Sequence, residues 1–136
     1  MIIVPPAAQA GPPGKPGSQF TGEAFPYLTL PATDGVVINT VDFTPCARTF
    51  WHRHERGQIL IVLAGRGLIQ AAGGPVRVMR AGDTIWAPPG ELHWHGGATD
   101  SYCVHTAISL GTTEWHEEVT EADYRATPES EVDDGV

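Results

Sequence analysis

Short runs of apolar and β-branched residues, each closed by a turn signal, follow one another from about residue 26 to residue 110. Residues 36–43 (VVINTVDF) are rich in β-branched side chains, and Thr44–Pro45 ends the run, so a strand is predicted there. Residues 58–63 (QILIVL) are continuously apolar after Gln58, as expected of a strand buried on both faces. We predict further strands over residues 49–54, 68–72, 75–79, 84–87, 91–96 and 102–110.

Glycine and proline mark the turns between these runs. Residues 64–67 (AGRG) predict a hairpin between the runs 58–63 and 68–72, and Pro88–Pro89–Gly90 predicts another turn. Strands and turns spaced by roughly 8–12 residues are typical of an all-β sandwich or barrel. After Gly111 the pattern changes, and residues 120–125 (TEADYR) predict one short C-terminal helix with Thr120 as its N-cap.

The 136 residues are enough for one domain with a hydrophobic core of its own. No internal repeat or second domain is visible. We predict a flexible Pro/Gly-rich arm over residues 1–18, a single domain over residues 19–126 and an acidic tail over residues 127–136.

The net charge of −8 belongs to one end of the chain, since residues 114–136 hold nine acidic residues and one basic residue. No basic patch remains elsewhere, so we expect no nucleic-acid partner. The apolar run at the N-terminus is too short for a signal peptide, and no stretch approaches the ~20 apolar residues that cross a bilayer. We therefore expect a cytoplasmic protein without a membrane partner. Cys46 and Cys103 form no CxxC pair, and two free thiols are expected.

Four of the six histidines form two His-x-His pairs on strand-like segments. Alternate residues of a strand point to the same face, so His52 projects beside His54, and His93 beside His95. Imidazole binds Mn, Fe, Co, Ni, Cu and Zn well. Gln58, across a tight turn from His54, can add an amide oxygen as a further ligand. One such pair alone is more often an ordinary polar pair, but two pairs beside Pro/Gly turns favour a metal site.

Two spaced motifs resemble those of the cupin superfamily. The first cupin motif is matched by Cys46-x5-His52-x-His54-x3-Gln58-x6-Gly65, and the second by Gly82-x5-Pro88-x-Gly90-x2-His93. The resemblance implies a jelly-roll β-barrel or sandwich that holds one divalent metal ion on His52, His54, Gln58 and His93. The chain departs from the usual pattern where Cys46 replaces Gly, where Gln58 replaces the commoner Glu, and where Gly97 replaces Asn.

Further residues resemble a subgroup of small bacterial cupins with a single cupin domain. They include Trp51 and Trp86, the run His93-Trp94-His95-Gly96, and Glu114-Trp115. The subgroup contains manganese-dependent cupin hydroxynitrile lyases and cupins associated with carboxymuconolactone decarboxylase. The resemblance to the lyases implies that His105 is an acid/base group. It also implies that the variable positions of the substrate pocket are Asn39, Val41 and Ser109.

The ligand set indicates the kind of chemistry. Gln58 brings no charge, so an M²⁺ centre with three neutral imidazoles keeps a formal charge near +2, which favours Lewis-acid chemistry over oxygen activation. His105, assisted by His95, is predicted to transfer protons, because an unperturbed histidine has a pKa of about 6.5. The competing interpretation is that both are buried structural histidines. Two small residues on the strand face of His105, Cys103 and Ala107, would leave space for a pocket, as would Ser109.

The leading hypothesis is therefore a metal-dependent, hydroxynitrile-lyase-like enzyme acting on a small carbonyl-type molecule. We expect Mn²⁺ as the cofactor, with Fe²⁺, Ni²⁺ or Zn²⁺ as alternatives. An Fe-dependent dioxygenase and a non-catalytic module that binds a metal or a small molecule are the competing hypotheses. A homodimer is expected because residues 58–63 are apolar on both faces, so their outer face needs a cover.

Overall fold

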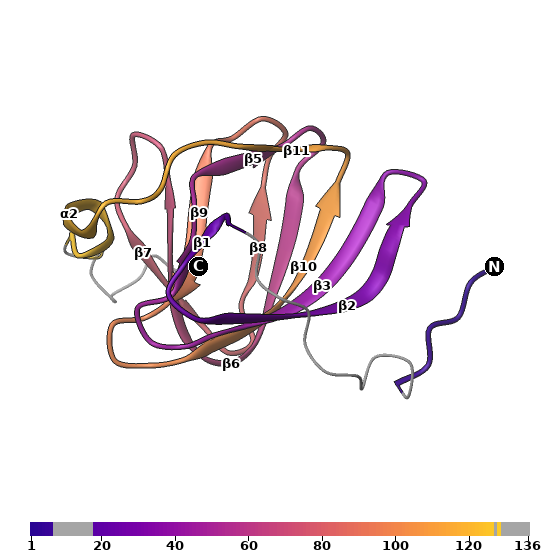
Figure 1. Cartoon of the computed structure of the whole chain (residues 1–136), viewed down its shortest axis with the longest axis horizontal. Helices are drawn as coiled ribbons and strands as arrows, with labels where there is room; N and C mark the ends of the chain where they lie inside the picture. Colours follow the sequence, from indigo (N-terminus) through magenta and orange to yellow (C-terminus); the bar gives the residue numbers. More distant parts are fainter. Residues whose placement is uncertain (7–17, 127, 129–136) are drawn as a thin grey trace.

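The computed structural model describes residues 1–6, 18–126 and 128. Two antiparallel sheets face each other and share one long bent strand, which gives a nearly closed barrel with a short helix at its side (Figure 1). This confirms the all-β class with one short C-terminal helix. The elements are β1 Phe20–Thr21, β2 Ala24–Thr33, β3 Val36–Phe43, β4 Arg48–Thr49, β5 His52–His54, β6 Gln58–Ala71, β7 Arg77–Arg80, β8 Thr84–Ala87, β9 His93–Gly97, β10 Cys103–Leu110, β11 Thr113–Trp115 and α2 Glu121–Tyr124.

Strand β6 belongs to both sheets because its two halves have different partners. Its first half pairs with β8 and β10, and β3 and β2 follow beyond β10; we call these strands sheet 2. Its second half pairs with β7 and β9, and β4, β1, β5 and β11 complete sheet 1. Alternate side chains of each strand point into the space between the sheets, where residues of β5, β9 and β10 meet.

The hairpin predicted over residues 64–67 is wrong, because the chain continues through this segment as one strand. Gly65 has a φ of +76°, and a Cβ atom there would lie 2.0 Å from the Tyr102 carbonyl oxygen. A Cβ atom at Gly67 would lie 2.5 Å from the Gly96 carbonyl oxygen. These glycines therefore serve the close approach of neighbouring backbones where β6 bends from one sheet into the other.

The other predicted strands recur with small changes. The strands over residues 36–43 and 84–87 have the predicted bounds, whereas the segment 49–54 divides into β4 and β5. The sequence pattern did not indicate β1, β2 or β11. The division into arm, domain and tail stays a prediction, because residues 7–17, 127 and 129–136 lie outside the described part of the chain.

Helix α2 and the segment before it cover the outer face of sheet 1. The predicted N-cap is confirmed: the Thr120 hydroxyl accepts a hydrogen bond from the Asp123 backbone N–H at 3.1 Å. The fully buried Tyr124 packs with Trp94, and its hydroxyl donates to the Gly97 carbonyl at 2.7 Å. The guanidinium of Arg48, which is 2% exposed, lies 4.4 Å from the centre of the Tyr124 ring.

One row of large apolar residues crosses the outer face of sheet 2. The members of the row are neighbours in strand register: Trp86, Ile59, Ile108, Ile38 and Leu30. None of them is buried, and the Trp86 side chain is 55% exposed. The homodimer expected from the sequence remains a proposal, and this row is the surface that supports it.

Two further expectations concern the chemistry and location of the chain. Both cysteines are free thiols, and burial raises the pKa of Cys103 to about 12, so this thiol stays protonated. In the parts of the chain that the structure covers, no helix has the length and apolar character required to cross a membrane. The cytoplasmic location stays a prediction from the sequence.

Candidate metal centre

The two His-x-His pairs lie side by side between the sheets. His52 and His54 come from β5, His93 and His95 from β9, and His52 is the register partner of His93. Each of the four side chains is 4% exposed or less. The ring centre of His52 lies 4.4 Å from that of His93, 5.0 Å from that of His54 and 5.2 Å from that of His95. Strand alternation thus brings four imidazoles into one buried cluster.

In each of these four rings the Nδ1 atom already has a partner. His52 Nδ1 lies 2.9 Å from the Phe50 carbonyl oxygen, and His93 Nδ1 lies 3.0 Å from that of Glu91. A carbonyl oxygen can only accept, so both Nδ1 atoms carry the proton and both Nε2 atoms present a lone pair. This arrangement, with Nδ1–H fixed and the lone pair on Nε2, is typical of histidine ligands to metals.

The remaining two rings expose an unsatisfied nitrogen to the cluster. His54 Nδ1 lies 3.0 Å from the Thr113 hydroxyl, and His95 Nδ1 lies 2.9 Å from His105 Nε2. The Nε2 atoms of His54 and His95 are buried and have no hydrogen-bond partner among the described residues. Buried polar atoms rarely lack a partner unless an ion or water satisfies them. The cluster therefore fits a bound cation.

Gln58 adds an oxygen to this cluster. Its side chain is 3% exposed, and its Oε1 lies 3.0 Å from His93 Nε2. Since His93 Nδ1 carries the proton, the two facing atoms are both acceptors, which repel unless a cation lies within reach of both. Gln58 Nε2 donates instead to the Ser109 hydroxyl, at 3.1 Å.

Three histidines of the cluster form a group that could hold a metal ion, and this group includes His95, which is not in the predicted ligand set. Ligand atoms of His52, His93 and His95 all lie within 4.8 Å of one another. The sequence predicted His52 and His93 together with His54 and Gln58, whose side chains adjoin this group. A three-histidine site of this kind can hold a divalent metal ion, whereas the complete ligand set stays a prediction.

Burial keeps these imidazoles neutral. It lowers the pKa of His52 and of His95 well below the usual value, reinforced by the neighbouring His93 and His105, respectively. Burial likewise lowers the pKa of His93, and it lowers that of His54 to about 4. Neutral imidazoles offer lone pairs, so the cluster is ready for a cation at neutral pH.

His105 lies beside the cluster, in the middle of β10. It is fully buried, contacts His95 through the 2.9 Å hydrogen bond, and packs at 5.2 Å from the ring centre of Phe43. Burial lowers its pKa to about 4. Its Nδ1 is buried without a hydrogen-bond partner in the described ranges. The two predicted proton-transfer residues thus form one connected pair.

The predicted pocket positions fall on neighbouring strands around His105. Val41 is its register partner on β3, and Asn39 is the register partner of Ala107. Cys103 and Ala107 are buried in an apolar cluster with Leu60, so they contribute apolar packing rather than polar contacts. Sequence reasoning missed three neighbours of the histidines: Phe43, Thr113, and Trp115, whose ring centre is 4.6 Å from that of His52. Of these three, only Trp115 was indicated by the sequence, because Glu114-Trp115 is part of the resemblance to small bacterial cupins.

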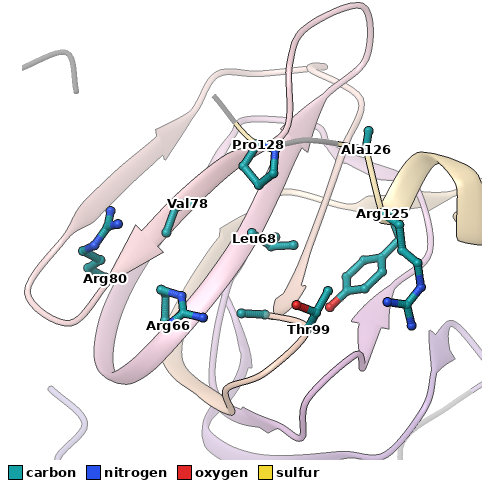
Figure 2. Close-up of a pocket in the computed structure, with 10 residues that line it drawn as sticks. Arg66, Leu68, Val78, Arg80, Thr99, Arg125, Ala126 and Pro128 are labelled. Carbon is teal, nitrogen blue, oxygen red and sulfur yellow. The ribbon is translucent and has the colours of Figure 1, made fainter. Parts of the chain in front are cut away.

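A separate pocket of about 780 Å³ lies on the opposite face of sheet 1, beside α2 (Figure 2). Trp94 points to this face, whereas its neighbours in β9 point to the histidine cluster. The pocket therefore does not belong to the candidate metal centre. It is lined by Arg66, Leu68, Val78, Arg80, Ala98, Thr99, Tyr124, Arg125, Ala126 and Pro128.

The barrel with histidines of two strands gathered inside it defines a cupin. Residues 39–109 match the cupin domain family (Cupin_2), and the chain belongs to this family. It is 41% identical over 116 residues to an (R)-mandelonitrile lyase of Granulicella tundricola, a match that covers 81% of this chain and 88% of that protein.

Solved structures agree with this family. A cupin-like protein of Thermotoga maritima is 39% identical with a TM-score of 0.80, covering 85% of this chain and 92% of that chain. A predicted oxalate decarboxylase from the same organism has a TM-score of 0.69 at 18% identity, covering 82% of this chain and 100% of that one. The second likeness concerns the fold alone.

Proposed function

We propose that the chain is a metal-dependent enzyme that performs redox-neutral, hydroxynitrile-lyase-like chemistry on a small carbonyl-type molecule. The observation that carries this proposal is the buried cluster of four neutral histidines with the Gln58 oxygen beside it. The 41% identity to an (R)-mandelonitrile lyase supports the same class of reaction. An aromatic cyanohydrin is therefore the first substrate to test.

The residues that would hold the ion are His52, His54, Gln58 and His93. All four are neutral, so Mn²⁺, the metal that we propose, would keep a formal charge near +2; Fe²⁺, Ni²⁺ and Zn²⁺ are the alternatives. Bound there, the ion would supply Lewis acidity toward an anionic oxygen or cyanide. A carboxylate in place of Gln58 would stabilise a higher oxidation state better, so the amide favours redox-neutral chemistry.

The paired histidines can move the proton that this reaction requires. In cyanohydrin cleavage a base takes the hydroxyl proton, and the oxygen then forms the carbonyl double bond while the bond to the nitrile carbon breaks. The electron pair of the broken bond leaves with cyanide, which takes the proton and departs as HCN. Burial keeps His105 neutral, so it can accept the hydroxyl proton. An anion formed beside His105 raises its pKa and so favours the protonated ring until the proton passes to cyanide.

The hydrogen bond between His95 and His105 links the choice of metal ligands to the role of His105 as a base. For His105 Nδ1 to act as a base, His105 Nε2–H must donate to His95 Nδ1, which leaves the proton of neutral His95 on its Nε2. His95 Nε2 then cannot bind a metal. If His95 were a ligand instead, His105 would carry its proton on Nδ1 and be a donor. The proposal therefore assigns His54 and Gln58, rather than His95, to the metal.

The test uses the 136-residue chain, stripped with a chelator and reloaded with Mn²⁺ or Fe²⁺. Racemic mandelonitrile is added, and benzaldehyde, cyanide and dissolved oxygen are followed together. We expect metal-dependent release of cyanide and benzaldehyde without oxygen uptake, and loss of this release in His52→Ala. Oxygen uptake with Fe²⁺ but no cyanide would overturn the proposal in favour of a dioxygenase. Neither reaction on a panel of aromatic and aliphatic cyanohydrins would overturn it in favour of a binding module.

A further inference from the structure

Gln58 and Ser109 face each other across the pair of strands β6 and β10. They are direct register partners, 51 residues apart in sequence, and their side chains are 3% and 7% exposed. The amide of glutamine has two different ends, an oxygen that accepts and an NH₂ group that donates. Only the oxygen can bind a cation, so the direction of the amide decides whether Gln58 is a ligand.

We propose that Ser109 is a positioning residue that directs the Gln58 oxygen toward the metal. The Ser109 hydroxyl accepts from Gln58 Nε2 at 3.1 Å, and this places Oε1 at 3.0 Å from His93 Nε2, inside the histidine cluster. The inference rests on the proposed function, because it assumes that the cluster holds a metal ion.

The same hydroxyl also satisfies the opposite direction of the amide. Without a cation, Gln58 Nε2–H can donate to the lone pair of His93 Nε2, while Oε1 accepts from the Ser109 O–H. A serine hydroxyl rotates and can serve as donor or acceptor, so Ser109 satisfies both directions. Metal binding then reverses the amide without leaving a buried polar group unpaired.

Removal of the hydroxyl raises the free energy of the metal-bound direction of the amide more than that of the metal-free direction. In Ser109→Ala the metal-bound state leaves the buried Gln58 NH₂ group without an acceptor. The metal-free state leaves only the Gln58 carbonyl oxygen without a donor. Buried N–H groups without partners are rarer in proteins than under-satisfied carbonyl oxygens. Partners that orient metal ligands typically contribute about 10–100-fold to metal affinity. We expect a loss in the lower part of that range.

The experiment measures the Mn²⁺ dissociation constant of the full chain by competition with a chelator. Ser109→Ala should bind Mn²⁺ about 10-fold more weakly, and Ser109→Thr, which keeps a hydroxyl, should restore the affinity. In a Gln58→Glu background the same Ser109→Ala change should cost less, because a carboxylate has no N–H that needs an acceptor. Thermal unfolding of each metal-free variant checks that the fold is retained.

A second readout observes the amide itself. In Zn²⁺-loaded, isotope-labelled protein, the Gln58 NH₂ protons should give nuclear Overhauser contacts to Ser109, and in metal-free protein to the His93 ring. Equal Mn²⁺ affinity of wild type and Ser109→Ala, or the same contacts in both states, would overturn the inference. Absence of metal binding by the wild type would instead overturn the proposed metal centre, so the two failures are distinguishable.

Discussion

Acidification should destabilise the metal-free protein through its buried histidines, and His105 offers the cleanest test. Its side chain is fully buried, and burial lowers its pKa from 6.5 to about 4. Between these two values the unfolded chain binds a proton at His105 and the folded chain does not. The free energy of unfolding therefore falls as the pH falls from about 6.5 to about 4. At 1.36 kcal/mol per pKa unit, His105 alone contributes up to about 3 kcal/mol to this loss.

The perturbation is His105→Leu, which removes the ionisable group and keeps a similar volume. We expect the pH dependence of the unfolding free energy to decrease by up to about 1.4 kcal/mol per pH unit between pH 4 and 6.5. Urea unfolding followed by tryptophan fluorescence, in the presence of a chelator, measures it. His116→Gln is the matched control, because His116 lies outside the cluster. An unchanged pH dependence in His105→Leu would refute the argument that His105 is neutral and buried.

Three further predictions follow from the site and the surfaces. His105→Ala should lower turnover of an identified substrate by about 10²- to 10⁴-fold while the metal content stays that of the wild type; full activity in the metal-loaded variant would contradict the catalytic role. Light scattering should give about twice the chain mass of 14.5 kDa, and Ile59→Lys should give a monomer; a monomeric wild type would contradict the dimer. Tyr124→Phe should lower the free energy of unfolding in urea by about 1–3 kcal/mol, because it leaves the Gly97 carbonyl unpaired; no change would show that α2 is not held by this bond.

Local sequence patterns predicted the features that depend on neighbouring residues. The His-x-His spacing gave the shared face of each pair, since strand alternation fixes it. The β-branched run gave strand β3 with its bounds, and Thr120 was found as an N-cap because capping depends only on the first turn of the helix. Cys46, which stands where the first motif has Gly, keeps a φ of +71°, so the turn survives the substitution.

Features that depend on distant residues could not be predicted. The pattern around Gly65 predicts a turn, because nothing nearby in sequence indicates that the Tyr102 backbone lies against this residue. The contact of Ser109 with Gln58 follows from the register of two strands 51 residues apart, which no local pattern encodes. The position of His95, close to both His52 and His105, likewise depends on how β5, β9 and β10 meet.

A metal count shows whether the buried histidine cluster binds one divalent metal ion. Protein purified without an affinity tag is analysed for its elements, then stripped and reloaded with Mn²⁺. We predict close to one ion per chain in the wild type and almost none in a His52→Ala/His54→Ala variant whose circular dichroism shows a retained fold. A folded double variant that keeps a full equivalent of metal would show that the ion, if bound, lies elsewhere than in this cluster.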